Sequence, residues 1–146
     1  MQKPKILLVD DNEVFQILFR DIFWLHGIDQ KFDLQVTDRI EKAELIIRDQ
    51  ATRPDIIFMG LVLPMEKDGK IIITPEAGFK LLDEIKGNSE WEKIKVIIFS
   101  SYNDKNYIKK AKDMGAYMYL VKEKNLPQDL VQLLDSLYAE QTTSVA

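Results

Sequence analysis

The sequence predicts an α/β fold in which a parallel β-sheet is covered by helices on both of its faces. Short apolar runs alternate five times with longer segments of helical periodicity, which is typical of strand–helix repeats. The apolar runs are nearly continuous, as expected for parallel strands buried on both faces. Polar residues directly follow several of these runs, so we expect a polar site at the carboxyl edge of the sheet.

The expected elements are bounded by apolar runs, turn residues and helix start and stop signals. Strands are expected at residues 5–9, 32–36, 56–59, 94–99 and 117–121. Helices are expected at residues 12–26, from 39 to the break at Arg53-Pro54, 76–86, 104–114 and 127–138. Residues 142–146 have no core-forming pattern and are expected to be loose.

The first helix is apolar over much of its circumference, and Gly27 is expected to end it. Besides its periodic apolar positions, the helix carries further apolar residues on its remaining face, namely Val14, Ile17, Phe23 and Trp24. We expect this helix to be deeply packed. The alternative is an exposed apolar stripe that binds a partner.

The second helix is expected to begin near Arg39. Asp38 and Glu41 have the spacing of a capping box, in which each side chain accepts a hydrogen bond from the helix start.

The segment of residues 66–74 is expected to form a small β-hairpin. Asp68-Gly69 is a strong signal for a two-residue turn, and the isoleucines at 71–73 suit a strand. The hairpin has three alternative roles: capping the site, offering a strand edge to a partner, or serving as a surface insertion without function.

Composition excludes several function classes. The apolar share of 46% and the charged share of 30% are ordinary for a folded domain. A net charge of −4 gives no electrostatic footprint for nucleic acid. No apolar run approaches a membrane span, and the four apolar residues after Lys5 are too few for a signal-peptide core. The absence of cysteine excludes disulfides and thiolate metal sites. Together these absences favour a cytoplasmic location, with no nucleic-acid or membrane partner.

Three apolar runs end in residues that suit one polar pocket. The first ends in Asp10 and Asp11, the second in Ser100, and the third in Lys122. Adjacent carboxylates after a buried strand are costly unless a cation or hydrogen-bond donors accompany them. The alternative is that one aspartate merely caps the first helix.

This order of acid pair, hydroxyl and lysine resembles the receiver domain of two-component response regulators. The resemblance covers residues 3–140 and implies a flavodoxin-like (βα)5 three-layer sandwich with strand order 2-1-3-4-5. It also implies one domain over residues 1–146, acting as a stand-alone receiver.

Gly60 departs from the family pattern. In receivers the strand matching residues 56–59 ends in the aspartate that accepts a phosphoryl group, and glycine has no nucleophile. The glycine is either natural, giving a pseudo-receiver, or an engineered change in a conventional Mg²⁺-dependent receiver. A substitute acid is a further alternative. Asp55 lies at the opposite end of the strand, while Glu66 and Asp68 lie in the inserted segment.

The resemblance also assigns roles to the other pocket residues. Asp11, Asp10 and the carbonyl of Val62 would hold Mg²⁺, although the missing third carboxylate argues against metal binding. Ser100 and Tyr119 would form the phosphate-responsive switch. Lys122 would contact the phosphoryl group, or pair with the acid pair in its absence. The family usually has proline after this lysine, whereas this chain has Glu123.

The leading hypothesis is therefore a phosphorelay signalling module that works by protein–protein contact and is not an enzyme. Its expected partners are a histidine kinase, another response regulator or an output protein. The sequence leaves a homodimer open. A flavin-binding role is disfavoured because the acidic loop after the first strand would repel phosphate. A hydrolase is disfavoured because the single histidine, His26, lies far from the acid pair.

Overall fold

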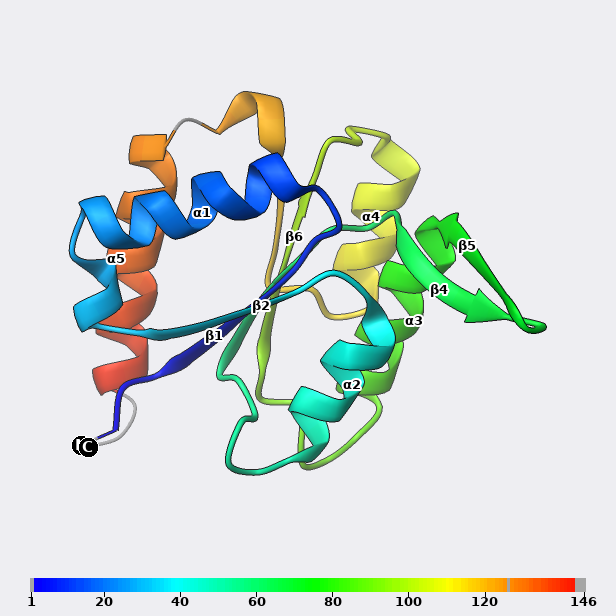
Figure 1. Ribbon diagram of the computed structural model, residues 1–146, viewed down its shortest axis with the longest axis horizontal. Coiled ribbons are helices and arrows are strands. Elements are labelled where there is room, and N and C mark those ends of the chain that lie inside the picture. Colours follow the sequence, from blue (N-terminus) through cyan, green and yellow to red (C-terminus); the bar gives the residue numbers. More distant parts are fainter. Residues whose placement is uncertain (1, 126, 144–146) are drawn as a thin grey trace.

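A central parallel sheet lies between two layers of helices in the computed structural model, which describes residues 2–125 and 127–143 (Figure 1). The sheet order is β2-β1-β3-β6-β7, so the predicted order of the five parallel strands is confirmed. Each strand boundary agrees with the sequence prediction to within one residue. The strands are β1 (Lys5–Val9), β2 (Asp33–Thr37), β3 (Ile56–Met59), β6 (Lys95–Ser100) and β7 (Met118–Val121).

Helices cover the two faces of the sheet in groups of two and three. α1 (Glu13–Leu25) and α5 (Pro127–Thr143) pack on one face, and α2 (Ile40–Arg48), α3 (Pro75–Lys86) and α4 (Lys105–Asp113) pack on the other. Short 3-10 turns follow α1 and β7, at Ile28–Gln30 and Lys122–Lys124. None of the helices in the described part of the chain is both long and apolar enough to cross a membrane.

The first helix begins and ends as the sequence predicts. The Asn12 side chain accepts a hydrogen bond from the N–H of Phe15 at 3.0 Å, which caps the helix. Gly27 follows the helix with a φ of 68°, a left-handed conformation that glycine adopts without steric cost.

The boundaries of α2 and α5 differ from the prediction. The capping box before α2 is wrong, because Arg39 is the N-cap residue and makes no side-chain cap. Asp38 instead pairs with Lys42 at 3.1 Å, and Glu41 accepts the N–H of Glu66 at 2.8 Å. The tail prediction is wrong for residues 142–143, which continue α5, while residues 144–146 lie outside the described residues.

α1 is not deeply packed over its whole circumference. Phe19, Ile22 and Phe23 are buried against the sheet, but Val14 is 76% exposed and Trp24 is 73% exposed. The expectation of deep packing is therefore wrong, and the alternative of an exposed apolar stripe describes this helix. The stripe consists of Val14, Ile17, Leu18, Trp24 and Leu25.

The predicted hairpin is confirmed and starts earlier than expected. β4 (Leu63–Lys67) pairs antiparallel with β5 (Lys70–Thr74). Asp68 and Gly69 form the turn with φ angles of 53° and 76°, which both central residues of a type I′ turn require. The hairpin projects from the body of the molecule at the right of Figure 1.

Gly78 allows α3 to approach the loop that follows β3. Its N–H donates to the carbonyl of Leu61 at 3.1 Å, and a Cβ at this position would lie 2.5 Å from that oxygen. We expect Gly78→Ala to lower the free energy of unfolding by about 1–3 kcal/mol, the range for overpacked interiors. Urea denaturation measures this change, and an unaltered midpoint would contradict the close approach.

Glu44 on α2 provides a pH-dependent contact with α3. Partial burial raises its pKa from 4.5 to about 7, helped by a hydrogen bond with Glu84 and by the negative charge of Glu84, against Lys80 and Arg48. The folded protein then retains a proton that the unfolded chain releases near pH 4.5. Folding stability from this group is therefore complete below pH 4.5 and is lost as the pH rises toward 7.

We expect urea titrations between pH 4.5 and 7 to show a smaller loss of stability for Glu44→Gln than for the natural sequence. Glu84→Gln is the matched variant, because it removes the neighbouring carboxylate and should also flatten the profile. Equal slopes in all three proteins would show that this contact does not titrate in that range.

Candidate functional site

Asp10 is the buried centre of the site. It follows β1, and its carboxylate oxygens accept hydrogen bonds from Lys122 Nζ at 2.7 Å and from the N–H of Asn12 at 2.9 Å. Its backbone N–H donates to the carbonyl of Thr37 at 3.0 Å, and its own carbonyl accepts from the Gln16 amide. The contacts with Lys122 and Asn12 satisfy a carboxylate that would otherwise be costly to bury.

Lys122 follows β7 and reaches across the carboxyl edge of the sheet to Asp10. Its ammonium also lies 4.1 Å from the centre of the Phe15 ring, within the range of a cation–π interaction. The side chain is 19% exposed, so the ammonium is only partly hydrated. The ion pair and the aromatic ring together fix the cation at this position.

Asp11 is the second acid of the predicted pair, and it faces solvent more than Asp10 does. Partial burial raises the pKa of its carboxyl group, and the neighbouring charge of Asp10 raises it further. Lys122 opposes this effect by stabilising the ionised form. The site therefore places negative charge in excess of the single ammonium that it contains.

Gly60 follows β3 and lies between β1 and the start of the hairpin. Its N–H donates to the carbonyl of Val9 at 2.9 Å, which continues the ladder between β3 and β1. A Cβ on Gly60 would lie 3.6 Å from Asp10 Oδ2 and 3.3 Å from Leu63 Cδ2. The backbone at Gly60 is not left-handed, so a small side chain fits if Leu63 gives by a few tenths of an ångström.

Ser100 and Tyr119 meet at the backbone of Tyr102. The buried Ser100 hydroxyl accepts the N–H of Tyr102 at 3.1 Å, and the Tyr119 hydroxyl donates to the carbonyl of Tyr102 at 2.8 Å. Burial is the main cause that raises the pKa of Tyr119. Both side chains therefore hold the loop that leads from β6 to α4.

Six of the seven predicted site residues line one cavity of about 280 Å³. Tyr119 is the exception and contacts the cavity wall through Tyr102. Ile73 of the hairpin also lines this cavity, so the inserted strand pair borders the site. The predicted residues in the lining are Asp10, Asp11, Gly60, Val62, Ser100 and Lys122.

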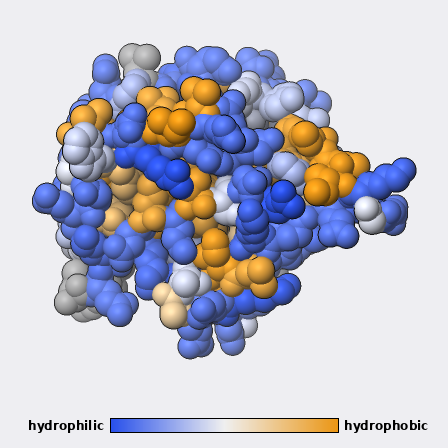
Figure 2. All heavy atoms as spheres, in the orientation of Figure 1, coloured by the Kyte–Doolittle hydropathy of each residue, from blue (hydrophilic) through white to orange (hydrophobic). Residues whose placement is uncertain are grey.

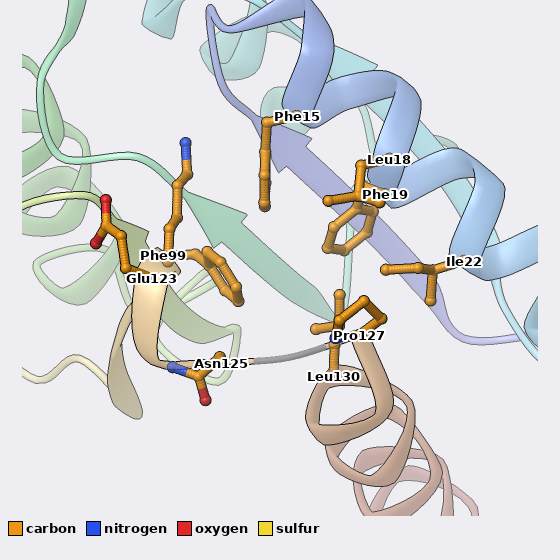
Figure 3. Close-up of a pocket in the computed structure, with 10 residues that line it drawn as sticks. Phe15, Leu18, Phe19, Ile22, Phe99, Glu123, Asn125, Pro127 and Leu130 are labelled. Carbon is orange, nitrogen blue, oxygen red and sulfur yellow. The ribbon is translucent and has the colours of Figure 1, made fainter.

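An apolar cavity of about 210 Å³ adjoins this site between α1 and the beginning of α5. Figure 3 shows Phe15, Phe19 and Ile22 projecting from α1 toward Phe99 and Leu130. Lys122 lines both cavities, so its alkyl stem separates an apolar space from a polar one.

Sequence reasoning missed the residues that support Asp10 and Lys122. Asn12 and Gln16 were visible only as parts of an expected helix, yet both contact Asp10. Phe15 has the periodicity of a core residue, and no sequence signal indicated that Lys122 would cover its ring. Tyr102 acts through its backbone, which carries no side-chain signature.

The donor set does not fit the divalent cation that the family resemblance implies. Asp10 already binds an ammonium and an N–H, and Gly60 contributes no carboxylate. Within residues 2–125 and 127–143, no group of three histidine, cysteine or acidic residues could hold a metal ion.

Comparison with known proteins identifies relatives over nearly the whole chain. It is 27% identical over 137 residues to sporulation initiation phosphotransferase F of Bacillus subtilis (strain 168), covering 94% of this chain and 93% of that protein. It is 25% identical to response regulator Rcp1 of Synechocystis sp. over 147 residues, covering 96% of this chain and 92% of that protein.

Solved structures show the same fold at lower identity. A CheY-like response regulator receiver domain protein from Methanospirillum hungatei JF-1 superposes with a TM-score of 0.76 at 17% identity, covering 98% of this chain and 99% of that one. The Mn²⁺-bound form of response regulator Rcp1 superposes with a TM-score of 0.69 at 20% identity, covering 92% and 91%. The family model described as the response regulator receiver domain matches residues 6–135. The chain therefore belongs to the response regulator receiver domain family.

Proposed function

We propose that this receiver of two-component signalling acts by protein–protein contact and does not carry a phosphoryl group itself. The observation that carries the proposal is Gly60. It lies after β3 in the same cavity as Asp10, Ser100 and Lys122, which is the place where the receiver resemblance puts the phosphoacceptor. Without an oxygen nucleophile at this position, no acyl phosphate can form there.

The acids considered as substitutes for that nucleophile do not line the cavity. Asp55 accepts the N–H of Lys5 at 2.8 Å at the opposite end of β3. Glu66 is exposed on β4, and Asp68 forms the exposed tip of the hairpin. These positions support the pseudo-receiver over a receiver that uses a neighbouring acid.

The ion pair between Lys122 and Asp10 supports a site that is stable without phosphate or metal. In the family pattern the lysine serves the phosphoryl group, whereas here it has a carboxylate at 2.7 Å and an aromatic ring at 4.1 Å. The site thus contributes a fixed shape to the surface around β6, α4 and β7 rather than a reactive centre.

The exposed stripe on α1 supports a role in binding. Val14 and Trp24 are large apolar side chains left in solvent, and such patches mark interaction surfaces on folded proteins. The partners that the family offers are histidine kinases, other response regulators and output proteins. We infer that one of these proteins binds the chain without the chain being phosphorylated.

Gly60→Asp is expected to create a phosphoacceptor. The new carboxylate would lie beside Asp10 and restore the third acidic side chain, and the backbone allows it. We expect the natural chain to show no covalent phosphoryl group after incubation with acetyl phosphate and Mg²⁺, and Gly60→Asp to gain one by intact mass spectrometry. Gly60→Asn is the matched control, because asparagine has nearly the same size and no nucleophilic carboxylate.

A phosphoryl group on the natural chain would refute the proposal, and peptide mapping would then locate the acceptor. Failure of Gly60→Asp to react while it remains folded would show that position 60 is not equivalent to the family's acceptor position.

Lys122→Met is expected to lower the free energy of unfolding by about 3 kcal/mol. This is the low end for breaking a buried ion pair, because Lys122 is 19% exposed. Methionine keeps the packing on Phe15 but leaves Asp10 without its cation. The double variant Asp10→Asn with Lys122→Met removes both charges and should recover most of the loss in a urea denaturation cycle. Additive losses in the cycle would show that the two charges do not interact.

A further inference from the structure

β5 has an open edge that no other element of the described chain covers. Its ladder to β4 ends in a two-residue turn, so the closing pair Lys67–Lys70 is hydrogen-bonded. Alternation along the strand then turns the N–H and carbonyl groups of Ile71 and Ile73 away from β4. Among the described residues, these outward groups have no hydrogen-bond partner.

β4, in contrast, has a closed edge. Pro64 has no N–H to offer, and the outward N–H of Glu66 donates to the Glu41 carboxylate of α2 at 2.8 Å. Proline and a covering helix are two devices by which proteins block strand edges against further pairing. The hairpin therefore offers one strand edge for pairing, and that edge belongs to β5.

The open edge also carries exposed apolar side chains. Ile71 is 60% exposed and Ile73 is 66% exposed, and both lie on the same side of the strand. Figure 2 shows an apolar patch on the projecting part of the molecule where the hairpin leaves the body. A strand edge with free backbone groups and apolar side chains is a template for pairing with another strand.

We propose that β5 pairs antiparallel with β5 of a second copy of this chain, forming a four-stranded sheet across a two-fold axis. A two-fold interface must be self-complementary, and the β5 sequence meets this condition in one register. With Ile72 on the axis, Ile71 of each copy lies opposite Ile73 of the other. This register brings the outward backbone groups of the two strands together as hydrogen-bonded pairs.

The same register buries the exposed isoleucine side chains and brings the Lys70 ammonium of one copy near the Glu76 carboxylate of the other. The Ile71 and Ile73 side chains of both copies would lie side by side on one face of the new sheet, removing them from water. Lys70, which forms no ion pair among the described residues, would lie beside Thr74 of the second copy. Glu76, two residues further on, already pairs with Lys67 of its own copy at 3.3 Å, so Lys70 of the second copy would share this carboxylate with Lys67.

The size of this interface predicts a reversible dimer. Stable interfaces bury roughly 1,200–2,000 Å² in total, more than one five-residue strand edge provides. The hairpin projects from the body of the molecule (Figure 1), so the proposed dimer relies on the strand pairing itself. We therefore expect self-association that depends on protein concentration.

Sedimentation velocity from micromolar to millimolar concentration tests the proposal. We expect the natural chain to shift from monomer to dimer, and Ile71→Lys to weaken this association roughly tenfold or more, because each copy would place an ammonium in the apolar row. Leu45→Lys is the matched control, since it makes the same change at an exposed leucine on α2. Circular dichroism confirms that both variants are folded.

The register has a separate test, because the chain contains no cysteine. Hydrogen-bonded antiparallel residues have Cα atoms about 5.5 Å apart, within the range of a disulfide. The double variant Ile71→Cys with Ile73→Cys should form a covalent dimer on mild oxidation, and peptide mapping should find residue 71 linked to residue 73. Leu45→Cys should not form a dimer under the same conditions.

Three outcomes would overturn the proposal. The first is that the natural chain stays monomeric throughout the concentration range. This outcome includes the case in which the β5 edge binds an extended peptide of another protein but not a second copy. The second is a dimer that Ile71→Lys leaves unchanged, which would place the interface elsewhere. The third is a dimer in which the two cysteines do not cross-link. None of these results depends on whether Gly60 can be phosphorylated.

Discussion

The ion pair between Lys122 and Asp10 is the interaction on which the polar edge of this sheet depends. It joins residues 112 positions apart and links the end of β7 to the end of β1, across the ends of two intervening strands. A carboxylate buried at this depth requires a cation or several donors. Asn12 and Phe15 complete the arrangement from the first turn of α1, so the helix that covers one face also stabilises the pair.

The helix-covered parallel sheet and the position of most of the site could be predicted because both follow from the strands and their ends, whereas the strand order came from the receiver resemblance. Apolar runs identified the buried strands, and parallel strands place their carboxyl ends at one edge. Asp10, Ser100 and Lys122 each follow such a run, and the structure brings them around one cavity. The turn at Asp68-Gly69 was equally readable, because few residues other than glycine and asparagine or aspartate adopt left-handed angles there.

The rest could not be predicted because it depends on packing that a single sequence does not encode locally. The apolar circumference of α1 does not tell which side meets the sheet, so the exposure of Trp24 was missed. Asp38 and Glu41 have capping spacing, but Asp38 pairs with Lys42 and Glu41 accepts a hydrogen bond from the hairpin. The contact of Lys122 with Phe15 depends on the distance between α1 and β7, which only the assembled fold determines.

The absence of a nucleophile at Gly60 limits which signals can shift this protein between two conformations. Ser100 and Tyr119 hold the loop after β6 through Tyr102, so on the proposed function we expect a signal to act by altering the position of this loop. A ligand shifts the equilibrium between two positions of this loop only by the difference between its affinities for the two conformations. A phosphoryl group could supply that difference through Lys122, but here Lys122 is already engaged by Asp10. On the proposed function this difference in affinity must come from a bound protein. That protein has to contact the loop after β6, or an element packed on it, differently in the two conformations. A partner on the α1 stripe alone would act through the contacts that connect that helix to the site. These are the contacts of Asn12 and Gln16 with Asp10 and of Phe15 with Lys122.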